Sequence, residues 1–207
     1  MRTILTRGCS LILALLFAAN FSNAQTVKLE QGQNGGIGNE RINPVSWSTG
    51  NSNAGNSHFF EGQSIPYRMT ISKLRPGNHT VEIEWDTRVS DKNAIDYITS
   101  FDRICETVIP DSGTPSFGTI PAPHGTPFPS NSFNKLSSEE KRISIYGGTI
   151  TGINYVQQDD ISGTSATTRL RISFNAQGAN GPNNTVVFAW GGHIAAAFDW
   201  GLGNSAS

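Results

Sequence analysis

The sequence has little charge and few strongly apolar residues. Asp, Glu, Lys and Arg make up 15% of the 207 residues, against about 25% in an average soluble protein. Hydrophobic residues make up 36%, and Gly, Asn, Ser and Thr fill the difference. This composition excludes a coiled coil or a helical bundle. The formal net charge is −1 and basic residues form no cluster, so a nucleic-acid-binding face is excluded as well.

Long apolar runs are missing, and the one near the N-terminus has the layout of an export signal. Arg2 and Arg7 give the first residues of the chain a positive charge, and the apolar run Leu11–Phe21 follows them. This run is too short to span a bilayer, which takes about 20 apolar residues. Ser22 and Ala24 provide the small residues of a cleavage site. We therefore predict a Sec-type signal peptide over residues 1–24, and a secreted or cell-surface protein with no transmembrane span after cleavage.

Cysteine is nearly absent. Cys9 lies inside the predicted signal peptide, so Cys105 is the one cysteine of the mature chain. A single cysteine excludes an internal disulfide and a zinc site built from several thiolates. The neighbouring Ile104 and Val108 favour a small, buried side chain at Cys105.

Apolar and polar residues alternate along much of the mature chain. Ile65–Ile71, Val81–Trp85 and Leu170–Phe174 alternate strictly, and Thr185–Trp190 is almost continuously apolar. Period two predicts half-buried strands, and the continuous run predicts a buried central strand. Short strands between turns rich in Gly, Pro and Asn predict an all-β protein, with an antiparallel β-sandwich over residues 25–207.

Three connections allow local predictions. Arg75–Asn78 carries a Pro-Gly pair between two alternating runs, which predicts a tight turn and a β-hairpin. The many prolines of residues 110–134 predict a long loop insert without regular structure. Only residues 93–100 and 137–142 have patterns that allow short helices.

Catalytic signatures are missing too. The four histidines form no HExxH pattern, and no G-x-S-x-G elbow occurs. The string Asp111–Thr114 matches half of an aspartic protease site, but its second copy is missing. We therefore predict that the protein is not an enzyme. The alternative is a carbohydrate-binding or accessory fragment of an extracellular hydrolase, which a convergent carboxylate or His–Ser group would reveal.

Acidic and aromatic residues allow two kinds of ligand. Asp86, Asp91 and Asp96 follow one another at intervals of five residues around a predicted loop. Hard oxygen ligands on loops suit calcium, so a calcium-stabilised spacer domain is a further alternative. Apart from calcium, no cofactor is expected. Tryptophans and tyrosines can stack on sugar rings, and Trp200 is the tryptophan that we expect to be most exposed.

Three segments together resemble a module that recurs in secreted and surface-attached bacterial proteins. They are Phe60–Arg68, Leu74–Arg103 and Val187–Ser205. A Leu-x-Pro-Gly string in the second segment is also similar to prealbumin-like and fibronectin-like surface domains. The resemblance implies a β-sandwich used for display, adhesion or spacing, without catalytic residues. Similar modules continue past the point that corresponds to Ser207, which implies that the sandwich lacks its final strand, through truncation or because a partner completes the sheet.

These observations predict an exported recognition or structural module. We expect it to bind a surface protein or a glycan through loops at one end of the sandwich. The predicted loop 86–103 and the segment His193–Trp200 carry the candidate binding residues, which are Asp86, Asp96, Tyr97, Asp102, Arg103, His193, Asp199 and Trp200.

Overall fold

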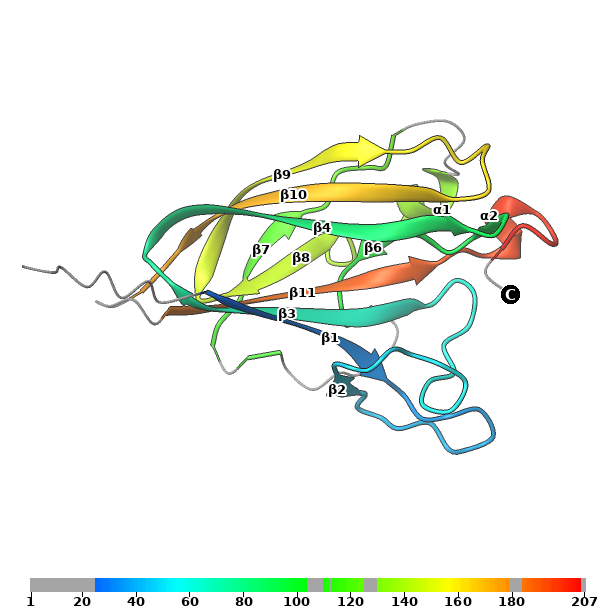
Figure 1. Ribbon diagram of the computed structural model, residues 1–207, viewed down its shortest axis with the longest axis horizontal. Helices are drawn as coiled ribbons and strands as arrows, with labels where there is room; N and C mark the ends of the chain where they lie inside the picture. Colours follow the sequence, from blue (N-terminus) through cyan, green and yellow to red (C-terminus); the bar gives the residue numbers. More distant parts are fainter. Residues whose placement is uncertain (1–24, 104–109, 112, 125–129, 179–183, 206–207) are drawn as a thin grey trace, which may run out of the picture.

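A computed structural model shows two antiparallel β-sheets packed face to face (Figure 1). It describes residues 25–103, 110–111, 113–124, 130–178 and 184–205. Strands hold 52% of the residues and helices 5%, so the predicted all-β sandwich is confirmed. The predicted signal peptide and Cys105 lie outside the described residues.

The larger sheet has seven strands, and β11 lies at its centre. The strand order is β2-β1-β3-β11-β8-β7, and β6 also pairs with β11. The almost continuous apolar run of β11 is buried from Val186 to His193, as expected for a central strand. The strands are β1 (Thr26–Gln33), β2 (Ser46–Ser48), β3 (Ser64–Leu74), β6 (Ile95–Thr99), β7 (Ser116–Thr119), β8 (Arg142–Tyr146) and β11 (Asn184–Ile194).

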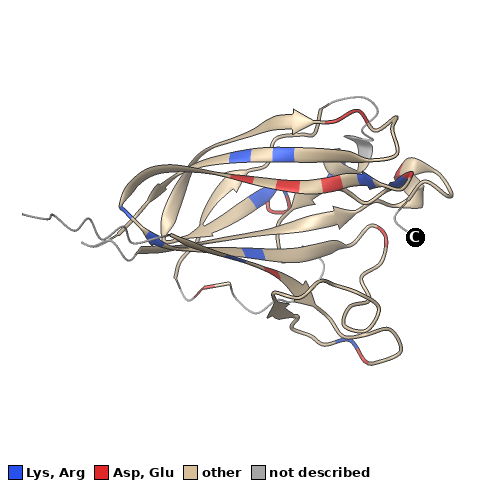
Figure 2. Ribbon diagram, viewed as in Figure 1, with Lys and Arg blue, Asp and Glu red and all other residues tan. Residues whose placement is uncertain are grey.

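The smaller sheet has four strands in the order β5-β4-β10-β9. They are β4 (Gly77–Val89), β5 (Lys92–Asn93), β9 (Gly148–Gln158) and β10 (Ala166–Ala176). Figure 2 shows an acidic row on β4 beside a basic row on β10. Arg171 Nη2 lies 2.7 Å from Glu82 Oε1, and Arg169 Nη2 lies 2.6 Å from Glu84 Oε2. The charged row therefore faces solvent, while the alternate apolar residues of both strands face the larger sheet.

The predicted hairpin between β3 and β4 is wrong. β3 pairs with β1 and β11, whereas β4 pairs with β10 and β5, so the connection at Arg75–Pro76 carries the chain from one sheet to the other. Met69 and Ile71 of β3 and Ile83 of β4 meet in the core between the sheets. A Pro-Gly turn occurs in crossovers between sheets as well as in hairpins. Local alternation defines the buried face of a strand, but it does not define which strand is its partner.

Two further local predictions are corrected. Residues 93–100, predicted as a short helix, contain the end of β5 and all of β6, because pairing with β11 overrides the weak local helix pattern. Residues 110–134, predicted as a loop without regular structure, contain the short edge strand β7, with prolines just outside its ends. Of the short helices in the described residues, α1 (Ser130–Lys135) begins inside this predicted loop and α2 (Ala197–Trp200) follows β11. Residues 137–142, the other segment whose pattern allowed a helix, form a turn and the start of β8.

A buried ion pair joins β1 and β3. Glu30 is 5% exposed, and its carboxylate lies 2.8 Å from Lys28 Nζ and 2.9 Å from Arg68 Nε. Burial by itself raises the pKa of Glu30, but the hydrogen bonds and charges of Lys28 and Arg68 outweigh burial and hold the pKa below its ordinary value of 4.5. Because the pKa of Glu30 is lower in the folded than in the unfolded protein, the ionised carboxylate stabilises the fold at pH values above the unfolded pKa. This stabilisation is lost as the pH falls through the folded pKa.

We expect Glu30→Gln to lower the free energy of unfolding at pH 7 by about 1 to 2 kcal/mol, because Arg68 stays largely buried without a counter-charge. Urea unfolding at pH 7 and at pH 3 measures the effect. The difference between wild type and variant should be smaller at pH 3 than at pH 7, because stability that comes from a lowered pKa is lost as the pH falls. An equal difference at both pH values would contradict the electrostatic origin.

Candidate functional site

The structure brings four of the predicted binding residues together at one end of the sandwich. His193 Nδ1 lies 2.7 Å from Asp96 Oδ1, and Trp200 Nε1 donates to Asp96 Oδ2 at 3.2 Å. The ring of Tyr97 stacks on His193 with centroids 4.2 Å apart. Because the carboxylate of Asp96 only accepts hydrogen bonds, His193 carries its proton on Nδ1 when Asp96 is ionised.

A glycine of β11 allows this group to form. β6 and β11 lie side by side with Tyr97 opposite His193 and Thr99 opposite Gly191. A Cβ on Gly191 would lie 2.5 Å from the backbone oxygen of Ser100 and 2.6 Å from Thr99 Oγ1. The absence of a side chain at Gly191 therefore lets β6 approach β11 closely enough to place Asp96 beside His193.

These four residues join β6, β11 and the two short helices, and we refer to them as the latch. Asp96 and His193 are 1% and 3% exposed, and Tyr97 is equally buried. The hydroxyl of Tyr97 donates to Ser132 Oγ at 3.1 Å and its ring packs edge-on against Phe133, which ties β6 to α1. Burial raises the pKa of Tyr97, so this hydroxyl stays a donor. The latch (Asp96, Tyr97, His193, Trp200) thus holds α1 and α2 against the larger sheet.

The Asp96–His193 pair is also the geometry that orients a histidine base in hydrolases. A hydrolase needs in addition a nucleophile hydrogen-bonded to the other ring nitrogen. Within the described ranges, no serine or threonine hydroxyl is hydrogen-bonded to His193. Asp96 and His193 are 1% and 3% exposed, so the pair lies buried between the strands that it joins.

Three other predicted binding residues, Asp102, Arg103 and Asp199, do not belong to the latch. Arg103 Nε lies 3.1 Å from Glu140 Oε1, and Arg103 Nη1 donates to the backbone oxygen of Gly62 at 3.0 Å. Hydrogen bonding to Ser137 and the charge of Arg103 hold the pKa of Glu140 below its ordinary value, despite partial burial. Arg103 is thus a clamp between two loops, whereas Asp102 is exposed and Asp199 on α2 is half-buried.

The three aspartates predicted as calcium ligands do not form one site. Asp86 is exposed on β4, Asp91 is exposed and lies 3.9 Å from Arg88 Nη2, and Asp96 is buried in the latch. Among the residues that the structure describes, no group of three or more His, Cys, Asp or Glu side chains could hold a metal ion. The segment folds as strands and a tight turn, so Asp86 lies on β4, Asp91 in the turn before β5 and Asp96 on β6.

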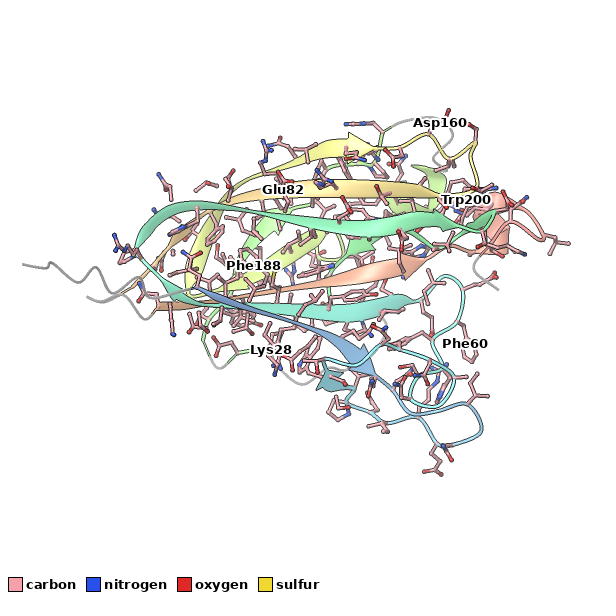
Figure 3. All side chains as sticks on the ribbon, viewed as in Figure 1. Lys28, Phe60, Glu82, Asp160, Phe188 and Trp200 are labelled. Atoms are coloured by element: carbon pink, nitrogen blue, oxygen red, sulfur yellow. The ribbon has the colours of Figure 1, made fainter. Side chains whose placement is uncertain are left out.

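Large exposed apolar side chains, which no sequence pattern marks, lie on α2 and on the loops beside it. Phe198 is 85% exposed and Leu202 is 93% exposed, and Phe60 lies on the adjacent loop (Figure 3). Glu61 joins the two loops, because its carboxylate accepts hydrogen bonds from the amide of Ala197 at 2.9 Å and from Ser205 Oγ at 2.6 Å. We refer to Phe60, Phe198 and Leu202 as the apolar loop end.

These residues carried little signal in the sequence. They are isolated apolar residues in segments rich in Gly, Asn and Ser, so no periodicity marks them. Ile37 and Ile42, on the loop between β1 and β2, are also exposed and lack periodicity in the same way. An apolar residue between turn residues, with no strand to belong to, is the pattern that could have found them.

A cavity of about 340 Å³ lies at the side of the sandwich, between β4 and the larger sheet. Its walls include Tyr67, Trp85 and Trp190, and the Tyr67 and Trp190 rings stack with centroids 5.8 Å apart. Burial raises the pKa of Tyr67. Trp85 and Trp190 are the two tryptophans that alternation predicts to point inward, so the cavity is a gap at the edge of the core.

No helix in the described ranges is long and apolar enough to cross a membrane. Comparison with known proteins identifies no relative: no family model, no curated protein and no solved structure matches the chain. The functional proposal therefore rests on the geometry of the chain itself.

Proposed function

We propose that the protein is an exported, non-enzymatic recognition module that binds a surface protein through its apolar loop end. The exposure of Phe198 and Leu202 carries the proposal. Large apolar side chains that project from loops gain free energy when a partner removes them from water. Glu61 links the segments that carry these side chains, so one partner can reach more than one of them.

The chemistry of the apolar loop end favours a protein over a glycan. Phe and Leu side chains offer no hydrogen bonds, whereas a sugar needs polar partners for its hydroxyl groups. Trp200, the tryptophan predicted to be available for stacking, donates its indole N–H to the carboxylate of Asp96. Aromatic and aliphatic anchors are typical of the central part of protein–protein interfaces.

The latch prepares the apolar loop end for binding. Trp200 anchors α2 through Asp96, and Glu61 anchors the loop that carries Phe60 to the start of α2. Loops held in place before binding lose little conformational entropy when the partner arrives. This arrangement supports recognition by a preformed surface.

Site-specific photo-cross-linking tests the proposal. A benzophenone amino acid replaces Phe198 in the exported protein, and Arg75, which is exposed at the opposite end of the sandwich, is the control position. On the surface of the producing cells, position 198 should give one discrete, saturable adduct and position 75 should give none. Equal labelling from both positions, or no adduct from position 198, would contradict recognition at this end.

We also propose that a strand of a partner pairs with β4. The free edge of β4 supports this part of the proposal. β4 pairs with β10 over Gly77–Arg88, but on its other side it pairs with β5 only at Arg88 and Val89. The stretch Gly77–Thr87 thus has no strand neighbour on that side within the described residues, and its last backbone oxygen, that of Thr87, accepts a hydrogen bond from the amide of Ala94 at 2.9 Å. Unpaired amides and carbonyls along an edge strand are the usual site of strand addition.

A further inference from the structure

The free edge of β4 borders an apolar surface that no strand covers. Val27 and Leu29 of β1 lie opposite Ile71 and Met69 of β3, which belong to the core, so all four residues face the same side of the larger sheet. Yet Val27 is 63% exposed and Leu29 is 54% exposed. The larger sheet therefore extends past β4, as Figure 1 shows for β1. A strand added to β4 would run along this overhang on the side of Leu29, which lines the cavity.

The cavity opens at the same place. Leu29, Tyr67, Trp85 and Val89 all line it, so both the overhang and β4 contribute to its walls. Side chains on the inner face of an added strand would enter this space. Trp85 Nε1 is buried and has no hydrogen-bond acceptor among the described residues, so a bound segment that brings an oxygen gains one more bond.

The acidic outer face of β4 favours a partner strand that carries positive charge. Glu82, Glu84 and Asp86 point outward in one row. Arg171 and Arg169 of β10 pair with the two glutamates, but Asp86 lies opposite Thr167 and has no basic partner in the described structure. A second copy of the chain paired through its own β4 would place two acidic rows side by side, which is unfavourable. An incoming strand with basic residues on its outer face is favoured instead.

β10 already pairs with β4, so its sequence indicates which residues suit a strand beside β4. Over residues 168–172 it alternates Thr, Arg, Leu, Arg, Ile, with arginines outward and apolar residues inward. We propose that β4 binds an extended segment of a partner polypeptide with the same alternation, basic outward and apolar inward, and that one inward side chain fills the cavity beside Leu29. This inference rests on the proposed strand addition and names the chemistry of the strand. It is independent of the apolar loop end.

A labelled peptide with the sequence of residues 167–176 (TTRLRISFNA) tests the inference on the purified protein. Fluorescence anisotropy should show saturable binding. Leu29→Asp should weaken binding by about tenfold, because it places a charge at the cavity. Val27→Asp is the matched control, since Val27 is as exposed as Leu29 but does not line the cavity, and it should change binding by less than about threefold. Equal effects of the two variants would overturn the proposal.

A peptide with both arginines replaced by glutamate (TTELEISFNA) tests the charge. It should bind about fivefold more weakly, and Asp86→Lys should restore part of the loss. Hydrogen exchange gives the position of binding: the first peptide should slow exchange in Gly77–Thr87 and leave β9 unchanged. Faster exchange in β9 would mean that the peptide replaces β10, which overturns the proposal.

Two other outcomes separate this inference from strand addition itself. If both peptides bind equally and both protect Gly77–Thr87, strand addition holds but the proposed charge preference is overturned. If neither peptide binds up to about 1 mM, both are overturned. Binding of glucose or galactose at the cavity without peptide binding would assign the cavity to a glycan and would also overturn the inference.

Discussion

Replacing Asp96 with alanine is expected to lower the free energy of unfolding by about 3 kcal/mol. The two carboxylate oxygens of Asp96 accept hydrogen bonds from His193 and from Trp200. Alanine leaves the His193 N–H without an acceptor in a site that water does not reach, and it releases α2 from the sheet. For a domain of this size the melting temperature should fall by about 6 to 12 °C.

Asp91→Ala is the matched control for this prediction. Asp91 is exposed and lies 3.9 Å from Arg88, so its removal should change the free energy of unfolding by less than about 0.5 kcal/mol. Both aspartates were candidates for calcium, and a shared calcium site would make the two variants equally unstable. Urea unfolding, with calcium and with EDTA, compares them. Similar losses for Asp91→Ala and Asp96→Ala would contradict the latch.

The second large effect is expected at Gly191. Gly191→Ala places a Cβ 2.5 Å from the backbone oxygen of Ser100, which cannot move without opening the pairing of β6 with β11. We expect a loss of about 2 to 3 kcal/mol from this steric conflict. Near-ultraviolet circular dichroism should change as well, because the stacking of Tyr97 on His193 depends on that pairing.

Gly152→Ala provides the comparison for this substitution. Gly152 lies in β9, where an added Cβ would have no neighbour closer than 3.9 Å. Alanine there should be neutral or stabilise by up to about 1 kcal/mol, because it restricts the unfolded chain. If both glycine variants lose the same stability, the effect is general to glycine in strands and the close approach at Gly191 is not its cause.

Alternation predicted the strands of this protein better than their partners. The runs around Met69, Ile83 and Leu170 became β3, β4 and β10 with the expected inward faces. The hairpin prediction was wrong because Arg75–Pro76 joins two sheets, and nothing local distinguishes such a crossover from a hairpin. Residues 93–100 became strand because of β11, which lies far along the chain, so the cause is outside any local window.

The site shows the same limit. Asp96, Tyr97, His193 and Trp200 were predicted as binding residues and do come together, but in a buried latch. The polar residue types indicated a role for these positions in the sequence. They did not show that the helices and a neighbouring strand cover them in the fold. The exposure of Phe198 follows from α2 lying at the end of the sandwich, which depends on contacts between distant segments.

The cross-linking yield from position 198 in a chain that also carries Phe60→Ser and Leu202→Ser tests the central claim most directly. Both replaced side chains are exposed, so the melting temperature should stay within about 2 °C of wild type. The account predicts that the adduct is lost from this stable variant. An adduct of undiminished yield would contradict recognition through the apolar loop end.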